Sequence, residues 1–278
     1  MLDSAATRTS PPITVTGQPL IERGGDILAL TPRQIRRIAR ARGPSQTLPG
    51  IVMRQAATEY RLWLVRKVNF RHRDNHAAVS AYCEMDGDDF RGINARQSWS
   101  NWRTIPRNLA GRLPNRPVRV IDLCCGIGES TEVLACYAAP GSWLLGLEYS
   151  PRFVAIARER SRAIRDDRGQ PADVHFVAQS VLDTFRDDED QPLADASIDL
   201  VNASGAVGCH FDRAATAVLA REVARVLVPG GLATIDSGKS GTSSADLRTL
   251  FADQGMEQIG DAHSCVFDRY RQLCMRKS

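Results

Sequence analysis

The chain has 278 residues, of which 43% are hydrophobic and 24% are charged, and its formal net charge at pH 7 is +4. A chain of this length can bury one large core with an extension, so neither disulfides nor a structural metal is needed for folding. No apolar run approaches the ~18 residues that a membrane span needs, and the N-terminus lacks the basic and apolar regions of a signal peptide. We therefore expect a cytoplasmic protein.

Residues 1–25 are rich in Pro, Thr and Gly and lack periodicity, which predicts a mobile tail or an extended arm. From Thr31, "TPRQIRRIARARG" offers an N-cap threonine, a proline at the first helical position and a closing glycine, which predict a short arginine-rich helix. Residues 1–80 hold 13 Lys/Arg and 5 Asp/Glu, whereas the remainder holds 23 and 27, so the basic excess lies here. We interpret this helix as a solvated surface helix, with an RNA or membrane contact as the alternative.

A second helix is predicted for "QAATEYRLWLVRKVNF", where apolar and basic residues alternate to give an apolar face. A third helical stretch near "AAVSAYCEM" leads into turn residues, and Pro114 and Pro117 mark the boundary that follows. We therefore divide the chain into a flexible N-terminal arm (1–25), a helical cap that forms the substrate region (26–115) and a main domain that binds a cofactor (116–278).

After Arg116, short apolar runs alternate with helical stretches. Strands and helices that alternate at this spacing predict an α/β fold with a doubly wound sheet. The predicted strands are "VRVIDL", "SWLLGLEY", "VHFVAQ", "SIDLVNAS", "GLATIDS" and a tail within "DAHSCVFDRYRQLCM". Seven cysteines occur without a Cys-x-x-Cys pair, and we expect them to be reduced and mostly buried.

The first predicted strand leads into a glycine-containing turn in "RVIDLCCGIG", where Asp122 precedes Gly126 and Gly128. A glycine-rich first turn of an α/β sheet lets the backbone approach a cofactor beyond the carboxyl ends of the strands. Glu148 closes the second strand 20 residues beyond Gly128, a spacing at which a carboxylate can bind both ribose hydroxyls of an adenosine. A dinucleotide fingerprint would place a third glycine at Thr131, so S-adenosylmethionine, whose cationic end suits Asp122, is favoured.

Four ordered motifs make the chain from about Arg116 onward resemble the class I S-adenosylmethionine-dependent methyltransferases: "VIDLCCGIGEST", "LLGLEYSP", "SIDLVNASGAVGCHF" and "EVARVLVPGGLATID". The resemblance implies a Rossmann-like sheet of seven strands, mostly parallel with the last strand antiparallel, and methyl transfer from S-adenosyl-L-methionine to a small-molecule acceptor. The cofactor-binding residues that it implies are Asp122, Cys124, Gly126, Gly128, Glu148, Tyr149, Ser180, Val181 and Asn202.

The sequence departs from the family pattern at two positions. Cys124 stands where the family usually has its first loop glycine, so we expect that this position avoids a positive φ or that the loop is wider. After the third strand, Gln179 and Ser180 replace the acid that often binds the adenine amino group. Ser180 or the neighbouring backbone would then have to contact adenine.

Few catalytic residues are expected, because the cofactor carries an activated methyl group and the protein supplies alignment and, for a protonated acceptor, a base. His210 follows the fourth strand and is the candidate base; the alternative is a helix-start histidine with a structural partner. The segment before the first motif resembles quinone-biosynthesis methyltransferases, which implies that Tyr82 covers the methionine end of the cofactor and that Trp99 walls the pocket. The alternative is a set of aromatics that anchors a cap helix. Asn94 and Ser204 complete the predicted substrate-binding residues, and Tyr82 and His210 are the predicted catalytic ones.

The absence of several family motifs from the sequence argues against some classes of methyl acceptor. The fourth motif lacks the Asn/Asp-Pro-Pro-Tyr/Phe loop that similar enzymes use for amide or adenine nitrogens, which argues against nucleic acid as acceptor. No metal site is evident, the cysteines do not reproduce the pattern of arsenic methyltransferases, and no membrane partner is expected. Two alternatives stay open, a non-catalytic subunit of this fold and an RNA-directed enzyme or RNA-binding protein. RNA binding would use Arg36, Arg37, Arg40 and Arg42. The sequence does not identify the acceptor atom, and a homodimer is possible.

Overall fold

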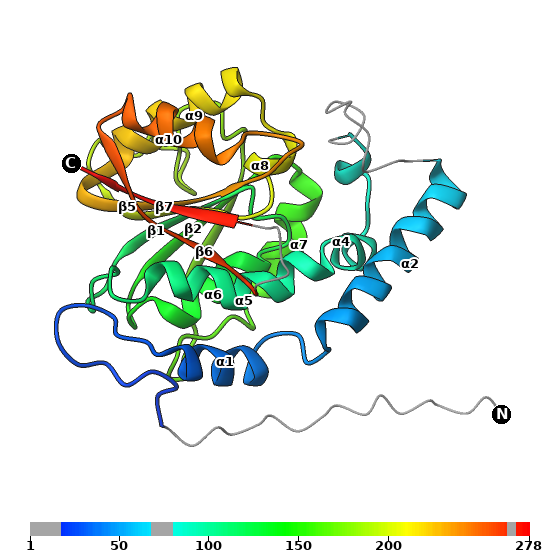
Figure 1. The fold of residues 1–278 in the computed structure, drawn as a ribbon, viewed down its shortest axis with the longest axis horizontal. Helices are drawn as coiled ribbons and strands as arrows, with labels where there is room; N and C mark the ends of the chain where they lie inside the picture. The colour runs from blue at the N-terminus through cyan, green and yellow to red at the C-terminus, as the bar shows by residue number, and fades with distance from the viewer. Residues whose placement is uncertain (1–17, 68–79, 266–270) are drawn as a thin grey trace.

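A computed structural model describes residues 18–67, 80–265 and 271–278 of the chain. A seven-stranded sheet lies between two layers of helices (Figure 1). In the described ranges, no helix is both long and apolar enough to cross a membrane. The strands are β1 (Arg119–Leu123), β2 (Trp143–Glu148), β3 (Asp173–Ala178), β4 (Ile198–Ala203), β5 (Leu227–Ser237), β6 (Met256–His263) and β7 (Arg271–Lys277).

The strand order is β3-β2-β1-β4-β5-β7-β6. Strands β1 to β5 pair in parallel, whereas β7 pairs antiparallel with both β5 and β6. The predicted Rossmann-like sheet with an antiparallel last strand is therefore confirmed. The order reverses between β1 and β4, which is the place where α/β sheets of this kind bind ligands.

Alternate residues of the strands enter two separate cores, because successive side chains of a strand point to opposite faces. Val120 packs in one core with α5 (Ala95–Leu109) and α6 (Glu129–Tyr137), and Ile121 packs in the other with α9 (Arg213–Val226) and α10 (Ser244–Ala252). Both faces of the sheet are covered, as a parallel sheet requires. The helices after β1 are α6 (Glu129–Tyr137), α7 (Pro151–Ser161), α8 (Val207–His210), α9 (Arg213–Val226) and α10 (Ser244–Ala252).

Residues 18–25 are the part of the predicted arm that the structure describes, and they pack on the main domain. Ile21 is 1% exposed. The Arg23 guanidinium donates to the Asp167 carboxylate at 3.2 Å and to the main-chain carbonyl of Tyr137 at 3.1 Å. A largely buried ion pair with further hydrogen bonds fixes this segment in place.

The arginine-rich helix predicted from Thr31 is confirmed as α1 (Pro32–Ala41). Thr31 Oγ1 accepts from the Gln34 amide and the Gln34 side chain accepts from the Thr31 amide, which forms a capping box. The second predicted helix is also confirmed as α2 (Leu48–Arg66), although it begins before the predicted segment. The third is described only from residue 80 onward, where residues 80–83 are helical.

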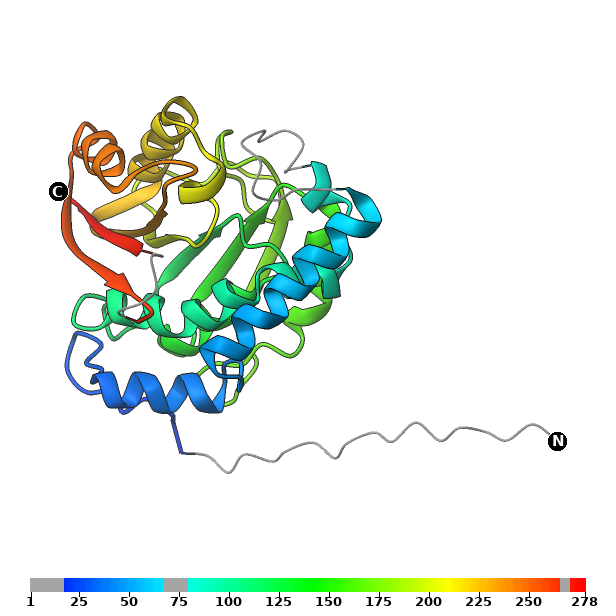
Figure 2. The ribbon, with the colours of Figure 1, turned by 45° about the vertical axis from the view of Figure 1, so that its right-hand side comes forward.

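The predicted cap consists of two parts with different neighbours. Helix α5 (Ala95–Leu109) shares the core of the main domain, since its Ile105 and Leu109 lie in one cluster with Val120 of β1. Helices α2 and α4 (Gly87–Ile93) instead form a small cluster with Phe153 of α7. Figure 2 shows α2 along the outer side of this region. The second part reaches the carboxyl edge of the sheet, where a cavity opens.

Candidate functional site

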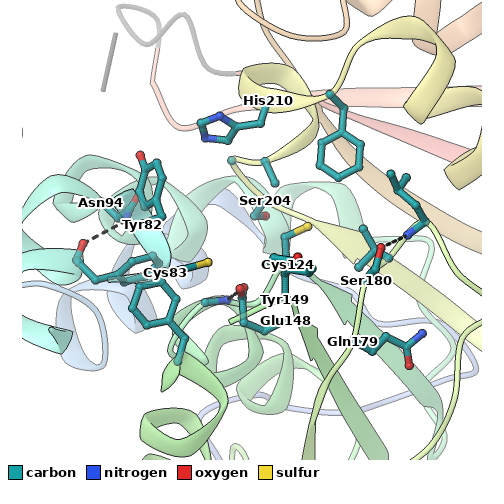
Figure 3. Close-up of a pocket in the computed structure, with 18 of the residues that line it drawn as sticks. Tyr82, Cys83, Asn94, Cys124, Glu148, Tyr149, Gln179, Ser180, Ser204 and His210 are labelled. Carbon is teal, nitrogen blue, oxygen red and sulfur yellow. Dashed lines mark hydrogen bonds between the residues drawn. The ribbon is translucent and has the colours of Figure 1, made fainter. Parts of the chain in front are cut away.

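A cavity of about 720 Å³ lies beyond the carboxyl ends of β1, β2, β3 and β4 (Figure 3). This volume is within the usual range of small-molecule sites. The lining comes from the loops after these strands, from α8 and the start of α9, and from the segment 80–97 that precedes the main domain. The predicted site residues that line it are Tyr82, Asn94, Cys124, Gly126, Glu148, Tyr149, Ser180, Val181, Ser204 and His210.

The loop after β1 contains three residues with positive φ: 52° at Cys124, 56° at Gly126 and 83° at Gly128. The expectation that Cys124 avoids a positive φ is therefore wrong. A non-glycine residue in this region costs about 1–2 kcal/mol, and the hydrogen bond from the Cys125 amide to a β2 carbonyl helps to hold the turn. A Cβ atom on Gly126 would lie 2.5 Å from the ring of Phe90, so glycine is required where the segment 80–97 meets the loop.

Asp122 lies behind this loop and does not line the cavity. Its side chain is almost completely buried, and Oδ2 accepts from the hydroxyls of Ser130 and Thr131, each at 2.6 Å. Oδ1 accepts from Asn202 Nδ2 at 2.7 Å. Burial raises the pKa of Asp122, and these hydrogen bonds oppose that shift. The carboxylate thus ties the start of α6 to β4, where the sequence predicted a contact with the ligand.

Asn202 and Gly128 also stand behind the lining. Asn202 Oδ1 accepts from Thr234 Oγ1 and from Gln272 Nε2, each at 2.9 Å. Gln272 Nε2 also donates to Ser204 Oγ at 3.1 Å, and Ser204 reaches the cavity. A buried network of satisfied polar groups of this kind fixes a unique arrangement. It connects β7, near the end of the chain, to the loop after β1.

Glu148 ends β2 and reaches over the loop after β1. Its Oε2 accepts from the Gly126 amide and its Oε1 from the Ser150 amide, both at 2.9 Å. Burial raises the pKa of Glu148, while the backbone donors favour its charged form. A carboxylate has about four acceptor sites, so Glu148 retains capacity toward the cavity. Tyr149, which is 63% exposed, flanks the rim.

The turn after β3 closes the cavity on another side. Gln179 bonds within this turn, since its Nε2 donates to the Thr184 carbonyl at 3.1 Å. Ser180 Oγ accepts from the Leu182 amide at 3.2 Å, and Ser180, Val181 and Leu182 all line the cavity. Gln179 lines the cavity as well, so the turn presents one hydroxyl, one amide and two apolar side chains.

His210 ends the one-turn helix α8 and meets Tyr82 from the other side of the cavity. The two ring centroids are 5.5 Å apart at an interplanar angle of 76°, an edge-on contact. Burial lowers the pKa of His210 and, as the largest cause, raises the pKa of Tyr82. At neutral pH the imidazole is therefore neutral and can accept a proton, while the phenol stays protonated and can donate a hydrogen bond.

Trp99 does not line the cavity, which corrects its predicted role. It is 8% exposed, packs with Ile51 and Ala95, and carries the guanidinium of Arg103 at 3.6 Å from the ring centroid. Five helical residues correspond to a rotation of about 140°, so Trp99 faces away from the cavity that Asn94 lines. The alternative interpretation, an aromatic residue that anchors a cap helix, agrees with this position.

Several lining residues are not among the predicted site residues. Gln97 donates to the main-chain carbonyl of Ser204, and its place one helical turn after Asn94 was the available signal. The rings of Phe90 and Phe153 pack at a tilt of 57° with centroids 4.5 Å apart, although the two residues are far apart in the sequence and no pattern links them. The remaining unassigned lining residues include Ser80, Cys83, Glu84, Leu182, Phe211 and Ala215.

All seven cysteines are free, as expected, but three rather than most of them are buried. Cys83 and Cys124 line the cavity, and burial raises the pKa of both, so they are neutral thiols at neutral pH. Within the described part of the chain, no group of three or more His, Cys, Asp or Glu residues could hold a metal ion.

Comparison with protein families finds one match. The family model described as "Methyltransferase domain" matches residues 120–231. A trans-aconitate 2-methyltransferase from Methylobacterium nodulans is 39% identical over 75 residues, which are 26% of this chain and 29% of that protein. The match thus spans less than a third of the length of this relative.

Solved structures share the fold at low sequence identity. A chain in the complex between the Haloferax volcanii Trm112 methyltransferase activator and a methyltransferase is 20% identical, with 70% of this chain and 96% of that chain covered and a TM-score of 0.53. A TehB-like methyltransferase from Corynebacterium glutamicum is 16% identical, with 72% and 100% covered and a TM-score of 0.51. Likeness at this level of identity concerns the fold alone.

Proposed function

We propose a function from the premise that the chain contains a class I methyltransferase domain, which the family model matches over residues 120–231. We infer that the protein transfers a methyl group from S-adenosylmethionine to a small-molecule acceptor by in-line displacement. The observation that carries this proposal is the position of Glu148, which ends β2 beside the glycine loop and points into a cavity of about 720 Å³. The match to part of one relative supports the class of reaction. The acceptor has to be inferred from the residues that line the cavity of this chain.

The residues present fit the adenosyl cofactor. Glu148 offers acceptor capacity toward the ribose hydroxyls, and the turn after β3, with Ser180 and Val181, would flank the adenine. Gly126 lines the cavity and carries no Cβ, so a ligand can approach the main chain of the loop closely there. When bound, the cofactor would supply the activated methyl group. The chain's part is to hold it, exclude water and orient the acceptor.

We propose that His210 is the base for an acceptor whose reacting atom carries a proton. Its lowered pKa keeps the imidazole neutral at pH 7, and the Tyr82 ring supports it edge-on. The described lining contains Glu84 and Glu148 and neither arginine nor lysine. A negatively charged acceptor would therefore meet an unfavourable potential, whereas a neutral phenol, enol or amine would not.

Calorimetric titration of S-adenosylhomocysteine into the wild type and Glu148→Ala tests cofactor binding. We expect the dissociation constant to rise about tenfold or more in the variant, which corresponds to about 1.4 kcal/mol. Glu159→Ala, an exposed glutamate on α7 outside the lining, is the matched control and should bind as the wild type does. A folded wild type that does not bind would overturn the proposal.

Transfer of a radiolabelled methyl group to a panel of acceptors tests the acceptor class. We expect incorporation into neutral phenols or amines and little into trans-aconitate, because two carboxylates face the lining. Strong methylation of trans-aconitate would contradict the charge argument while leaving methyl transfer itself in place.

We further propose that the segment 80–97 closes the cavity over the ligands. It contributes Tyr82, Phe90, Asn94 and Gln97 to the lining, and Gln97 bonds to the loop after β4. Hydrogen exchange of this segment should slow when S-adenosylhomocysteine binds, whereas α10 on the far side should not respond. Equal protection of both regions would contradict a closing role.

RNA binding is the second candidate function. Arg33, Arg36, Arg37 and Arg40 are exposed on one face of α1 and line a surface hollow, but Arg42 is engaged by its hydrogen bond to the Asp166 carbonyl. RNA binding should weaken steeply with salt and be lost when the exposed arginines are replaced by glutamine. The open cavity argues against a non-catalytic subunit. A homodimer and a cytoplasmic location stay predictions, and light scattering would detect the homodimer.

A further inference from the structure

Asp236 is a buried carboxylate at the carboxyl end of β5, outside the cavity lining. It has no exposed surface, and its Oδ1 accepts from the amides of Ala206 and Val207 at 3.3 and 3.2 Å. Its Oδ2 accepts from the Gly208 amide at 2.9 Å. These donors belong to the start of α8, the four-residue helix that ends at His210. Asp236 therefore satisfies amides that a single helical turn cannot satisfy itself.

The chain after β5 also contacts α8 through its backbone. A Cβ atom on Gly208 would lie 2.3 Å from the Ser237 carbonyl carbon, so the two main chains meet without a side chain between them. The Gly241 amide donates to the Gly208 carbonyl at 2.9 Å, and the Thr242 amide donates to the Val207 carbonyl at 3.1 Å. Residues 236–242 thus hold the first half of α8 from one side.

A helix of one turn has too few internal hydrogen bonds to fix its own orientation, because nucleation of a helix is unfavourable. The direction of the His210 side chain must then be set by what α8 rests on. Tyr82 contacts the imidazole edge-on, but it belongs to the segment 80–97 that we propose to close over the ligands. Before closure, Asp236 and the chain that follows it are the supports that belong to the main domain.

We infer that Asp236 is a positioning residue, which holds α8 and thereby orients His210 toward the acceptor. This inference rests on the proposed function of His210 and gives a role to a residue that lies outside the predicted site. Burial raises the pKa of Asp236 to about 6, while the amide donors favour its charged form. The other titratable groups around α8 are Tyr82, Cys124, Cys209 and Asp212.

The test follows the titration of the His210 imidazole by NMR in the wild type and in Asp236→Asn, with His210→Asn to assign the signal. Asparagine keeps the size of the side chain but places an amide donor against the backbone donors of α8. We expect the pKa of His210 to rise by about 0.5 or more toward the ~6.5 of a solvated imidazole. The affinity for S-adenosylhomocysteine should change less than about threefold, because Asp236 lies outside the lining.

Two further variants keep the test decisive. Asp246→Asn, which changes a carboxylate in the first turn of α10, should leave the His210 titration unchanged. If Asp236→Asn does not fold, Thr242→Val replaces it: this change removes the Thr242 hydroxyl bond to the Phe211 carbonyl, 2.9 Å long, and should shift His210 in the same direction.

An unchanged His210 titration in folded Asp236→Asn, or an equal shift in Asp246→Asn, would overturn the inference. Loss of S-adenosylhomocysteine binding in Asp236→Asn would also overturn it, since Asp236 would then support the whole cavity. Loss of binding in the wild type would instead overturn the proposed function, so the two failures are distinguishable.

Discussion

Two sides of the cavity are built in different ways. The loop side consists of the loop after β1 and Glu148, and its polar groups bond to neighbouring strands of one sheet. The α8 side consists of Tyr82, His210 and Phe211, which come from two distant parts of the chain. Strand register alone brings the first set together, whereas the second depends on how helices and turns pack. The loop side should therefore tolerate change least, and the α8 side should determine what the protein accepts.

The two sides also differ in charge. Asp122 and Glu148 give the loop side carboxylates held by hydroxyl, amide and backbone donors. On the α8 side, burial keeps His210 uncharged and Tyr82 protonated at neutral pH. The Glu148 carboxylate at the cavity favours a positively charged ligand, and the neutral side suits a reaction in which a proton is transferred.

Asp122→Ala should give the largest effect on the loop side. It leaves the buried Ser130, Thr131 and Asn202 side chains without their acceptor, so we expect a loss of about 3–5 kcal/mol in the free energy of unfolding. Urea denaturation measures this loss. The exposed Asp183→Ala is the control and should stay within about 0.5 kcal/mol of the wild type. A loss below about 1 kcal/mol would show that the network does not hold the loop.

Trp99→Ala should destabilise the protein without touching either side of the cavity. Removal of this buried ring from Ile51, Ala95 and Arg103 should cost about 3 kcal/mol, with S-adenosylhomocysteine affinity unchanged. Thermal unfolding and calorimetry provide the two readouts. The half-exposed Trp63→Ala is a matched control with a smaller expected loss. Weakened binding in a folded Trp99→Ala would restore the predicted role in the pocket wall.

His210→Asn should lower the rate of methyl transfer, which depends on the α8 side, without affecting ligand binding at the loop side. Loss of a general base predicts a decrease of about 100-fold in methyl transfer, or about 2.7 kcal/mol, with unchanged S-adenosylhomocysteine binding. His175→Asn, which changes a surface histidine bonded to Asp173, should retain the rate. Equal rates in both variants would exclude His210 as the base.

The pH dependence follows from the lowered pKa of His210. The rate should be constant near pH 7 and fall tenfold per pH unit below that pKa, because the protonated imidazole cannot accept a proton. The free energy of unfolding should also fall on acidification, because the imidazole binds a proton more tightly in the unfolded chain. The loss occurs as the pH drops from 6.5 through the lower pKa of the folded state. A rate that rises on acidification would contradict this assignment.

Leu182→Ser should give the smallest effect. Leu182 is 40% exposed at the cavity, so its loss should raise the KM for an apolar acceptor a few-fold, or by less than about 1 kcal/mol. Cofactor affinity should not change. Steady-state kinetics measure the KM for the acceptor and the KM for the cofactor separately, and a change in the cofactor KM alone would place Leu182 beside the cofactor.

Residues of the loop side were the more predictable from sequence. Gly126 and Glu148 stand at fixed distances from strand ends, and both line the cavity. The motif identifies Asp122 as a site residue but does not predict its partners. The hydroxyls of Ser130 and Thr131, which donate to it, carry no distinct sequence signal. Cys124 was expected to avoid a positive φ, yet the surrounding loop imposes one.

The order of strands and helices, the two-faced sheet and the place of the glycine loop can be read from the sequence, because they depend on periodicity and short-range spacing. The fold is needed to see that Trp99 faces away from the cavity, that Gln97 and Phe90 line it, and that Asp236 holds the helix of His210. Such contacts join residues far apart in the chain. Their positions follow from the packing of whole elements, which no local pattern encodes.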